Sequence, residues 1–367
     1  MKYNWQRDDW PSFQYDLGEM QDLLFRFAEK TGRVDGQLSA LPESLQTETI
    51  VDLMVAEAIK SSEIEGEMLS RPDVMSSIKN NLGLNVEPTR VGDRRAEGIA
   101  ELMVCVRNNF NRALSQKMLF EWHSMLMMGA LRVKSGAWRT HSEPMLIVSG
   151  TIGDEQIHYE APPSKQVPSE MKRLVRWFNS TASGAADEIT FGPVRSAIAH
   201  LYFESIHPFE DGNGRIGRAL SEKVLSQGLG RPVLLSLSRS IAADRAGYYD
   251  ALKQAQRSVD ITGWIDWFVR MLLEAQEQAE TEIEFTLKKT KLFERIGDLL
   301  NDRQLKVVRR MLKEGSSGFH GGMSAKKYMA IAKTTKPTAT RDLQDLVKQD
   351  IFIPAGGGRS THYQINL

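Results

Sequence analysis

The chemically richest stretch of the 367-residue sequence runs from His207 to Arg218 and reads H-P-F-E-D-G-N-G-R-I-G-R. His207 can exchange a proton near neutral pH, and Asp211 is a carboxylate of the kind that holds a divalent cation beside phosphates. Gly212-Asn213-Gly214 can turn tightly and present backbone N–H groups to an anion at the start of a helix. Arg215 and Arg218 would share one face of that helix and bind further phosphate oxygens. The stretch therefore predicts a phosphate site with a proton acceptor and a metal ligand beside it.

The spacing of these residues differs from that of the common nucleotide-binding loops. No G-x-x-x-x-G-K-[ST] occurs in the sequence, and no G-x-G-x-x-G follows a strand-like run. These observations exclude a P-loop NTPase and a Rossmann dinucleotide site. Core packing does not explain why a histidine, an aspartate, an asparagine and two arginines surround two glycines. We therefore interpret the stretch as a functional loop.

The loop lies between two helical patterns in a body that we expect to be mostly α-helical. Apolar residues recur at helical spacing in the segments 50–60, 169–179, 192–205, 248–256 and 264–273.

A different pattern occurs at residues 145–159, where two β-rich runs surround a glycine-containing turn and predict a hairpin. Two interpretations of the hairpin stay open. It packs on the helices, or its free edge binds an extended peptide by strand addition.

The composition is that of a globular chain and argues against several other classes. Hydrophobic residues make up 41% and charged residues 26%, and the one cysteine, Cys105, cannot form an intramolecular disulfide. No apolar run reaches the roughly 20 residues that span a bilayer. The first 16 residues lack the apolar part of a secretion signal. We therefore expect a cytoplasmic protein without a membrane partner.

The charge is unevenly distributed, although 47 basic and 47 acidic side chains cancel. Residues 301–367 carry twelve lysines or arginines against five acids, which leaves +7 in this tail and −7 in the rest. The tail shows helical patterns at 302–313, 324–333 and 338–349, followed by two strand-like runs around a glycine turn. This order is typical of a winged helix-turn-helix. The tail is either a DNA-binding module or a docking and dimerisation module that does not bind nucleic acid.

The stretch from His207 to Arg218 matches the signature H-P-F-x-[DE]-G-N-G-R-x-x-R of the Fic family of protein adenylyltransferases at every specified position. The resemblance extends to Ser135–Arg139, to the hairpin and to Tyr159–Pro163, and Trp5 and Trp10 resemble a helical segment that precedes some bacterial Fic domains. It implies a mainly α fold, with a Fic helical core, a β-hairpin flap and a C-terminal winged-helix domain. The expected domains are an N-terminal helical region carrying the inhibitory pattern (1–95), a Fic core (96–275), a linker helix (276–300) and a winged-helix-like domain (301–367).

The resemblance also implies a reaction, in which AMP passes from ATP to a Ser, Thr or Tyr hydroxyl of a target protein and pyrophosphate leaves. His207 would be the general base that takes the proton of that hydroxyl. Asp211 would hold Mg²⁺ at the phosphates, Arg215 would contact the β-phosphate and Arg218 the γ-phosphate. The other implied roles are ATP contacts by Gly212, Asn213, Gly214, Ile216, Gly217, Tyr248 and Gln256, and target binding by the flap residues Ile147, Val148, Ser149 and Gly150.

A second pattern resembles the inhibitory motif of the family, [ST]-x-x-x-E-[GN], which Ser61, Glu65 and Gly66 match. It implies that Glu65 pairs with Arg218 and occupies the space that the γ-phosphate needs. The alternative interpretation is a solvated helix end, since neighbouring glutamates form a charged run here. Of the remaining histidines, His200 resembles a position that supports the loop, and we expect His123 to be a helix-packing residue.

Three alternatives to AMP transfer remain open at this point. The same loop serves removal of AMP, or transfer of UMP, phosphate or phosphocholine. A second alternative is a DNA-binding regulator in which the Fic core is a sensor. A third is a module that acts through self-association, for instance as a homodimer. The sequence names neither the target protein nor the signal that relieves inhibition.

Overall fold

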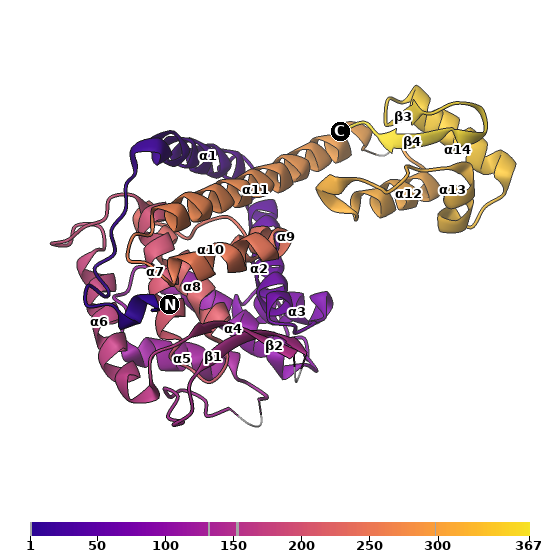
Figure 1. The fold of residues 1–367 in the computed structure, drawn as a ribbon. Coiled ribbons are helices and arrows are strands. Elements are labelled where there is room, and N and C mark those ends of the chain that lie inside the picture. The colour runs from indigo at the N-terminus through magenta and orange to yellow at the C-terminus, as the bar shows by residue number, and fades with distance from the viewer. Residues whose placement is uncertain (1, 131–132, 152–153, 298) are drawn as a thin grey trace. The chain divides into compact units, whose positions relative to one another are not determined.

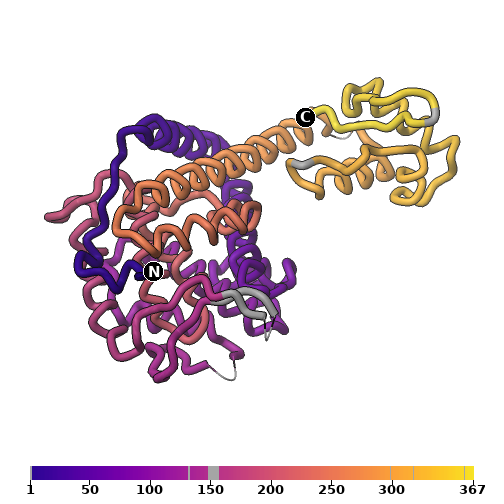
Figure 2. Tube along the Cα trace, viewed as in Figure 1, coloured from indigo at the N-terminus to yellow at the C-terminus, as the bar shows by residue number. Residues whose placement is uncertain are grey.

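The computed structural model describes residues 2–130, 133–151, 154–297 and 299–367 (Figures 1 and 2). The chain is mainly α-helical, as predicted, and its strands form two antiparallel hairpins. The helices are α1 (Gln21–Ser39), α2 (Glu43–Ile64), α3 (Arg71–Asn81), α4 (Arg94–Asn108), α5 (Gln116–Leu126), α6 (Val167–Ser180), α7 (Gly192–Ile206), α8 (Asn213–Leu229), α9 (Leu237–Ala243), α10 (Arg245–Ala255), α11 (Thr262–Ile296), α12 (Asp302–Leu312), α13 (Ala325–Ala332) and α14 (Lys336–Lys348). The strands are β1 (Leu146–Thr151), β2 (Asp154–Glu160), β3 (Phe352–Ala355) and β4 (His362–Ile365).

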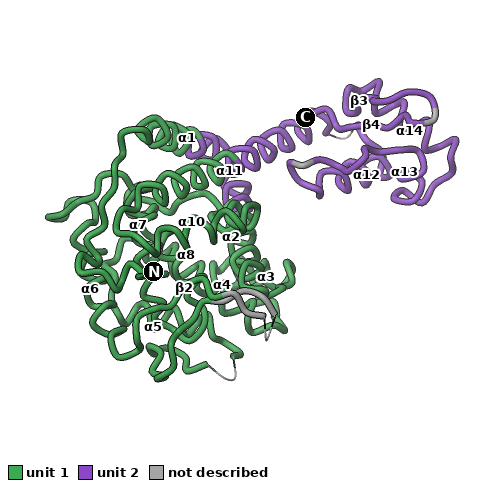
Figure 3. The backbone as a smooth tube through the Cα atoms, in the orientation of Figure 1, with its two compact units in different colours: residues 1–33, 50–277 green, residues 34–49, 278–367 purple. Residues whose placement is uncertain are grey.

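The chain forms two compact units, which Figure 3 shows in different colours. The first comprises residues 1–33 and 50–277, and the second comprises residues 34–49 and 278–367. Helix α11 runs without interruption through residue 275, where the sequence predicts the end of the Fic core. The second unit also takes in residues 34–49, which the sequence pattern assigns to the N-terminal region.

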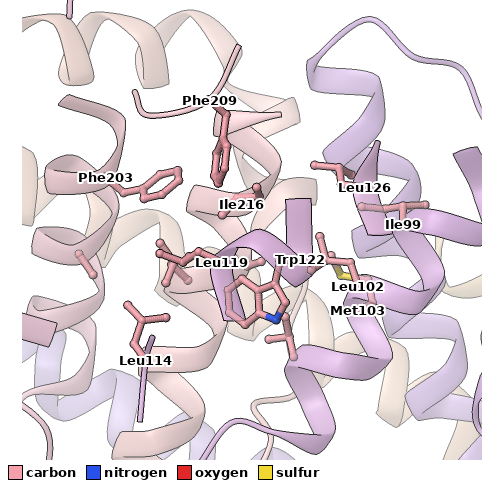
Figure 4. Close-up of a cluster of buried hydrophobic side chains, with 14 of the residues drawn as sticks. Ile99, Leu102, Met103, Leu114, Leu119, Trp122, Leu126, Phe203, Phe209 and Ile216 are labelled. Carbon is pink, nitrogen blue, oxygen red and sulfur yellow. The ribbon is translucent and has the colours of Figure 1, made fainter. Parts of the chain in front are cut away.

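Helix α7 is the central helix of the first unit. A proline in its first turn is compatible with the free N–H groups there, and every residue from Pro193 to Ile206 is buried. A helix that is buried all round must be covered on every side, and α8, α6 and the N-terminal segment pack against it. Helices α4 and α5 pack on α8, so that Trp122 and Phe209 lie in one apolar cluster (Figure 4).

The N-terminal segment fastens the hairpin β1–β2 to α7. Asn4 is buried, donates from Nδ2 to Ser205 Oγ at 2.9 Å and accepts from the Tyr159 hydroxyl at 3.1 Å. Trp5 Nε1 donates to the carbonyl of Glu160 at 2.7 Å. Asn4 and Trp5 therefore hold the base of the hairpin beside the end of α7.

The second unit has the order of elements that the basic tail predicts. Helices α12, α13 and α14 are followed by the antiparallel pair β3–β4, to which Met323 adds a single bridge at Tyr363. Its core joins the end of α11, through Leu292 and Ile296, to apolar residues of all three helices. Asp342 of α14 accepts from Arg303 and from the Tyr328 hydroxyl, each at 2.9 Å, and so ties α14 to α12 and α13.

Within the described residues, no helix has the length and apolar character needed to cross a membrane.

The close approach of α4 and α5 generates a test of this packing. A Cβ atom at Gly98 would collide with the carbonyl oxygen of Met125, so Gly98→Ala must push the two helices apart. We expect Gly98→Ala to lower the free energy of unfolding by about 1–3 kcal/mol, measured by urea denaturation. The control is Gly32→Ala in α1, where nothing lies within 4 Å of the added methyl group. Helix propensity alone makes that variant more stable by roughly 0.5–1 kcal/mol. Equal effects of the two substitutions would contradict the packing.

Candidate functional site

The predicted loop connects α7 to α8 and is bounded by two left-handed residues. His207 is the C-cap of α7 with φ of 49°, and its N–H donates to the carbonyl of Phe203 at 2.9 Å. Gly212 is the N-cap of α8 with φ of 81°, and a Cβ there would lie 2.8 Å from Leu126 Cδ2. A left-handed backbone at histidine costs free energy and persists where neighbouring groups hold it.

Arg139 supplies that support from outside the loop. It is buried, and its guanidinium donates to three backbone carbonyls, those of His207 at 2.8 Å, Pro162 at 2.5 Å and Ile206 at 3.2 Å. Burial lowers the pKa of Arg139 to about 10, which still leaves it protonated at neutral pH. The segment Ser135–Arg139 thus fixes the backbone of the proposed base and the connection that follows the hairpin.

His123 supports the other half of the loop and does more than pack a helix. Its Nδ1 accepts from the Gly136 N–H at 2.9 Å, so its Nε2 carries the proton and donates to the carbonyl of Asp211 at 3.2 Å. The ring stacks on Phe209 with the centroids 4.1 Å apart. Phe209 is fully buried.

Asn213 also holds the loop. Its Oδ1 accepts from the N–H of Phe209 and its Nδ2 donates to the carbonyl of Phe209, both at 2.9 Å. The side-chain amide is therefore occupied by the main chain. What the start of α8 can offer an anion is its backbone: the Ile216 N–H is the first to donate within the helix, to Gly212, so the N–H groups before it have no intrahelical partner.

The two arginines of the motif are both buried, and both face carboxylates that follow α2. Arg218, with 1% of its side chain exposed, donates from Nη2 to Glu65 Oε1 at 2.9 Å. It also contacts Ser61, from Nε to the hydroxyl at 2.9 Å and from Nη2 to the carbonyl at 2.8 Å. Burial lowers the pKa of Arg218, but Glu65 and other acids outweigh this effect and the pKa is raised. The pair of Glu65 and Arg218 that the sequence pattern predicts is therefore present.

The second pair was not apparent from the sequence. Arg215 donates from Nη1 to Glu67 Oε2 at 2.7 Å and from Nη2 to Asp211 Oδ1 at 3.3 Å. The sequence shows Glu67 as one member of a charged run, and nothing in its spacing distinguishes it from a solvated acid. Only the turn of the backbone after α2 directs it to Arg215.

That turn has a glycine for a physical reason. Gly66 has φ of 82°, its N–H donates to the carbonyl of Glu63, and the N–H of Glu67 donates to that of Ser62. This is a helix C-terminus closed by a left-handed residue, which glycine and asparagine adopt most readily. The need for a left-handed residue accounts for the [GN] position of the pattern. The turn that this residue makes directs Glu65 and Glu67 toward α8.

Glu65 lies over the start of α8. A Cβ atom at Gly214 would collide with Glu65 Oε1, so the carboxylate covers the backbone of Gly214 directly. The first N–H groups of α8 carry the positive end of the helix dipole. The Glu65 carboxylate therefore occupies the start of α8, which is where a bound phosphate would lie.

Helix α2 is fastened a second time, two turns before Glu65. Glu57 is buried and accepts from the N–H and the hydroxyl of Ser238 and from the Ser236 hydroxyl, the last at 2.8 Å. Ser236 is the N-cap of α9, so Glu57 satisfies donors at the start of that helix. Glu57, Ser61 and Glu65 thus bind α2 to the first unit along one face.

Two residues that the resemblance links to ATP lie inside the protein. Tyr248 and Gln256 are both buried, and Gln256 Nε2 is 3.5 Å from the carbonyl of Glu204. The Tyr248 hydroxyl is 2.8 Å from His200 Nε2, and His200 Nδ1 is 3.1 Å from Ser221 Oγ. These contacts hold both side chains against α7, and their contact with adenine and ribose stays a prediction.

The remaining ATP-contact positions, Ile216 and Gly217, are also buried in α8.

The predicted hairpin is present, with β1 and β2 antiparallel and a register shift between Ile147 and Val148. Each strand has one partner strand within the described residues, which leaves the other edge of β1 unpaired. The side chains of Val148 and Ser149, the position Gly150 beyond its backbone pairing, and the turn at 152–153 lie outside the described residues. The base of the hairpin is fixed by Tyr159, whose hydroxyl donates to the carbonyl of Ser205 at 2.8 Å.

Asp211 fits a magnesium ligand by its chemistry. It is the loop's one aspartate, its side chain is 53% exposed, and Oδ1 is held by the Gly212 N–H at 2.6 Å and by Arg215. Mg²⁺ takes one or two carboxylates and completes its shell with phosphate oxygens and water. Among the described residues no three potential protein ligands cluster together, so nucleotide oxygens would have to supply most of such a shell.

The two buried histidines that support the loop generate a prediction on pH. Burial lowers the pKa of His123 and of His200 below the ordinary value of 6.5. Below about pH 6.5 the unfolded chain binds protons that the folded chain does not, so stability falls as the pH falls. Each pKa unit of difference contributes about 1.4 kcal/mol. We expect the unfolding midpoint to decrease below that pH, and to decrease less in His200→Gln.

The control for this measurement is His320→Gln, since His320 is exposed. An identical pH dependence in wild type, His200→Gln and His320→Gln would show that buried histidines do not govern it.

Comparisons with known proteins agree with this geometry. A model of the Fic/DOC family matches residues 113–225, and a model described as a domain of unknown function, DUF4172, matches residues 3–84. A probable protein adenylyltransferase of Aquifex aeolicus is 33% identical over 99 residues, 27% of each chain. A protein adenylyltransferase Fic of Drosophila melanogaster is 33% identical over 108 residues, 29% of this chain and 19% of the relative. The chain thus matches less than a third of the length of these curated relatives.

Solved structures show the same fold over a larger part of the chain. A Fic family protein from Desulfovibrio desulfuricans has a TM-score of 0.53 at 21% identity and covers 94% of this chain and 96% of its own. A Fic domain containing signaling protein from Bacteroides thetaiotaomicron has a TM-score of 0.53 at 19% identity, over 71% of this chain and 97% of its own. With the complete motif on the α7–α8 loop, these matches show a Fic fold and a match to the Fic/DOC family model over residues 113–225.

Proposed function

We propose that the protein is an adenylyltransferase that transfers AMP from ATP to a hydroxyl side chain of a target protein, and that Glu65 holds it inactive. The observation that supports this most directly is the ion pair between Glu65 and Arg218 at the start of α8. In this ion pair, an arginine of the phosphate motif binds a carboxylate of the same chain where it would otherwise bind a phosphate. The adenylyltransferases among the relatives agree with AMP as the transferred group.

The transfer is a displacement at the α-phosphorus. The hydroxyl of the target Ser, Thr or Tyr attacks, His207 accepts its proton, and the bond to pyrophosphate breaks. The backbone N–H groups at the start of α8 stabilise the charge on the phosphate in the transition state. Mg²⁺ held by Asp211 would neutralise phosphate charge. The unpaired edge of β1 would align the target segment beside His207 by strand addition.

Inhibition follows from the occupation of both guanidinium groups. Arg218 would bind the γ-phosphate, but its Nε and Nη2 already donate to Ser61 and Glu65. Arg215 would bind the β-phosphate, but Glu67 and Asp211 hold it. A triphosphate that enters must replace these carboxylates or bind around them, and bound around Glu65 its α-phosphate is not aligned for attack. The same carboxylate could orient a water molecule, which is how the reverse reaction, removal of AMP, would use this site.

The test of this function is AMP transfer by Glu65→Gly. With ATP labelled at the α-phosphate, we expect Glu65→Gly to label itself or a lysate protein at least ~10-fold more than wild type, equivalent to about 1.4 kcal/mol of activation free energy. Glu63→Gly is the matched control, because Glu63 lies in the last turn of α2, close to Glu65 in sequence, but pairs with Lys60. Adding His207→Ala to Glu65→Gly removes the label. Absence of α-label in Glu65→Gly, or a label from γ-phosphate instead, would overturn AMP transfer.

A second function is favoured by the surface of α14 in the basic tail. Its apolar face is buried in the second unit, and its exposed face carries Lys336, Thr340, Arg341, Gln344 and Lys348. A basic and amide-bearing helix that follows a helix and a tight turn has the chemistry of a DNA recognition helix. We propose that residues 301–367 bind duplex DNA through this face. Lys327, in contrast, is engaged in the module itself, donating to the carbonyls of His320 and Gly322.

The corresponding prediction concerns salt dependence. We expect the full chain to bind a labelled duplex with an affinity that falls steeply with salt, since phosphate contacts release counterions. Arg341→Glu with Lys348→Glu should weaken binding by at least ~10-fold and flatten the salt dependence. Lys313→Glu, an exposed lysine at the end of α12, is the control for charge alone. Equal losses in the control and in the α14 variant, measured by fluorescence anisotropy, would place the contact elsewhere.

A further inference from the structure

Glu204 is a buried carboxylate that neither the motif nor the inhibitory pattern includes. It lies in the last turn of α7, three residues before His207. Its Oε2 is 3.5 Å from His207 Nδ1, and the two side chains are 6% and 16% exposed. An unpaired buried carboxylate is costly, so its place beside the proposed base requires an explanation.

Each of the two side chains has a polar atom that lacks a hydrogen bond. Within the described residues, His207 Nδ1 and Glu204 Oε1 are buried and lack a hydrogen bond of good geometry. A small rotation of either side chain would turn the 3.5 Å contact into a hydrogen bond. Catalytic hydrogen bonds are often long in ligand-free structures and shorten when substrate binds.

The surroundings of Glu204 keep it ionised. Burial raises the pKa of Glu204, but the close contact with His207 opposes this, with further contributions from His200 and Arg218, and the pKa is lowered. Gln256, from the other side, reaches the backbone carbonyl of Glu204 and not the carboxylate.

Gly217 of α8 provides the room for the carboxylate. A Cβ atom at position 217 would lie 2.5 Å from Glu204 Oε1 and 3.3 Å from His200 Cε1. Any side chain there would push Glu204 out of its position. The glycine within the last turn of the motif is thus explained by the space that the acid on α7 needs.

On the basis of the proposed function, we infer that Glu204 is a positioning residue for His207. The carboxylate accepts a hydrogen bond from the Nδ1–H, which fixes the ring and leaves the lone pair on Nε2 directed to the target hydroxyl. When the O–H bond of the target breaks, its proton goes to Nε2, the oxygen bonds to the α-phosphorus, and the bond to pyrophosphate breaks. The imidazolium that results lies beside the negative charge of Glu204 and is stabilised by it.

The assignment divides the support of His207 between two residues. Arg139 holds the backbone through the carbonyl of His207, and nothing in that contact sets the orientation of the ring. Glu204 acts on the ring, at the nitrogen that does not face the target. Loss of Glu204 should therefore impair proton transfer while ATP binding persists.

The first test reads the protonation of the His207 ring directly and needs no enzymatic activity. In protein labelled with ¹⁵N at histidine, the His207 signals are identified by their absence in His207→Ala. We expect the shifts of a neutral ring with the proton on Nδ1, and in Glu204→Gln a mixture of the two tautomers. A wild-type ring with the proton on Nε2, or an unchanged tautomer in Glu204→Gln, would overturn the inference.

The second test uses kinetics in the active Glu65→Gly background. We expect Glu204→Gln to lower kcat for AMP transfer by roughly 10²-fold, in the range of general-base effects, with KM for ATP within about twofold. Glu204→Asp, which keeps the charge, should recover part of kcat. An unchanged kcat, or a rise in KM alone, would overturn the positioning role.

The two proposals fail differently. If Glu65→Gly transfers no AMP while the His207 ring carries its proton on Nδ1 and loses that preference in Glu204→Gln, the reaction is wrong and the positioning of the ring stands. If Glu65→Gly is active and Glu204→Gln changes neither tautomer nor kcat, AMP transfer stands and the role of Glu204 is wrong.

Discussion

The buried guanidinium of Arg218 is the constraint on which the first unit depends. A charge taken out of water must be paired, and here the partners come from a helix more than 150 residues away in sequence. Ser61 and Glu65 meet this demand from α2, and Glu57 fastens the same helix to the start of α9. In the proposed function, the contact that pairs the buried charge is also the one that a triphosphate would have to replace or bind around. The packing of α2 and the proposed inhibition would then depend on the same interaction.

The shape of the loop between α7 and α8 is likewise held by a few side-chain contacts. Its functional surface consists of backbone N–H groups, the His207 ring and the Asp211 carboxylate, whereas side chains from elsewhere hold its shape. Arg139 binds its carbonyls at one end, and His123 binds a carbonyl at the other. Asn213 closes it from within. A loop held at three points keeps a left-handed histidine in place, and a ligand then meets donors that need no rearrangement.

The sequence predicts the local elements well because they follow from local patterns. The helices 302–312, 325–332 and 336–348 lie within about two residues of their predicted bounds, and the hairpin at 146–160 is present. The end of α11 could not be predicted, since a helix continues for as long as its neighbours cover it. Helix α11 therefore crosses residue 275, where the resemblance implied the end of the Fic core. The burial of Tyr248 could not be predicted either, because an aromatic residue on a helix gives the same sequence pattern in a core and in a ligand site.

By itself, the sequence determined that one loop carries a histidine, a carboxylate, a glycine turn and two arginines, because these residues are contiguous. It also marked Glu65 and Arg218 as partners through two separate short patterns. Only the tertiary structure decided that Glu67 faces Arg215, that the Asn213 amide bonds to the main chain of the loop, and that Glu204 lies beside Nδ1 of His207. The reason is physical: which charges meet depends on how helices pack and turn, and a sequence records neighbours along the chain but not across it.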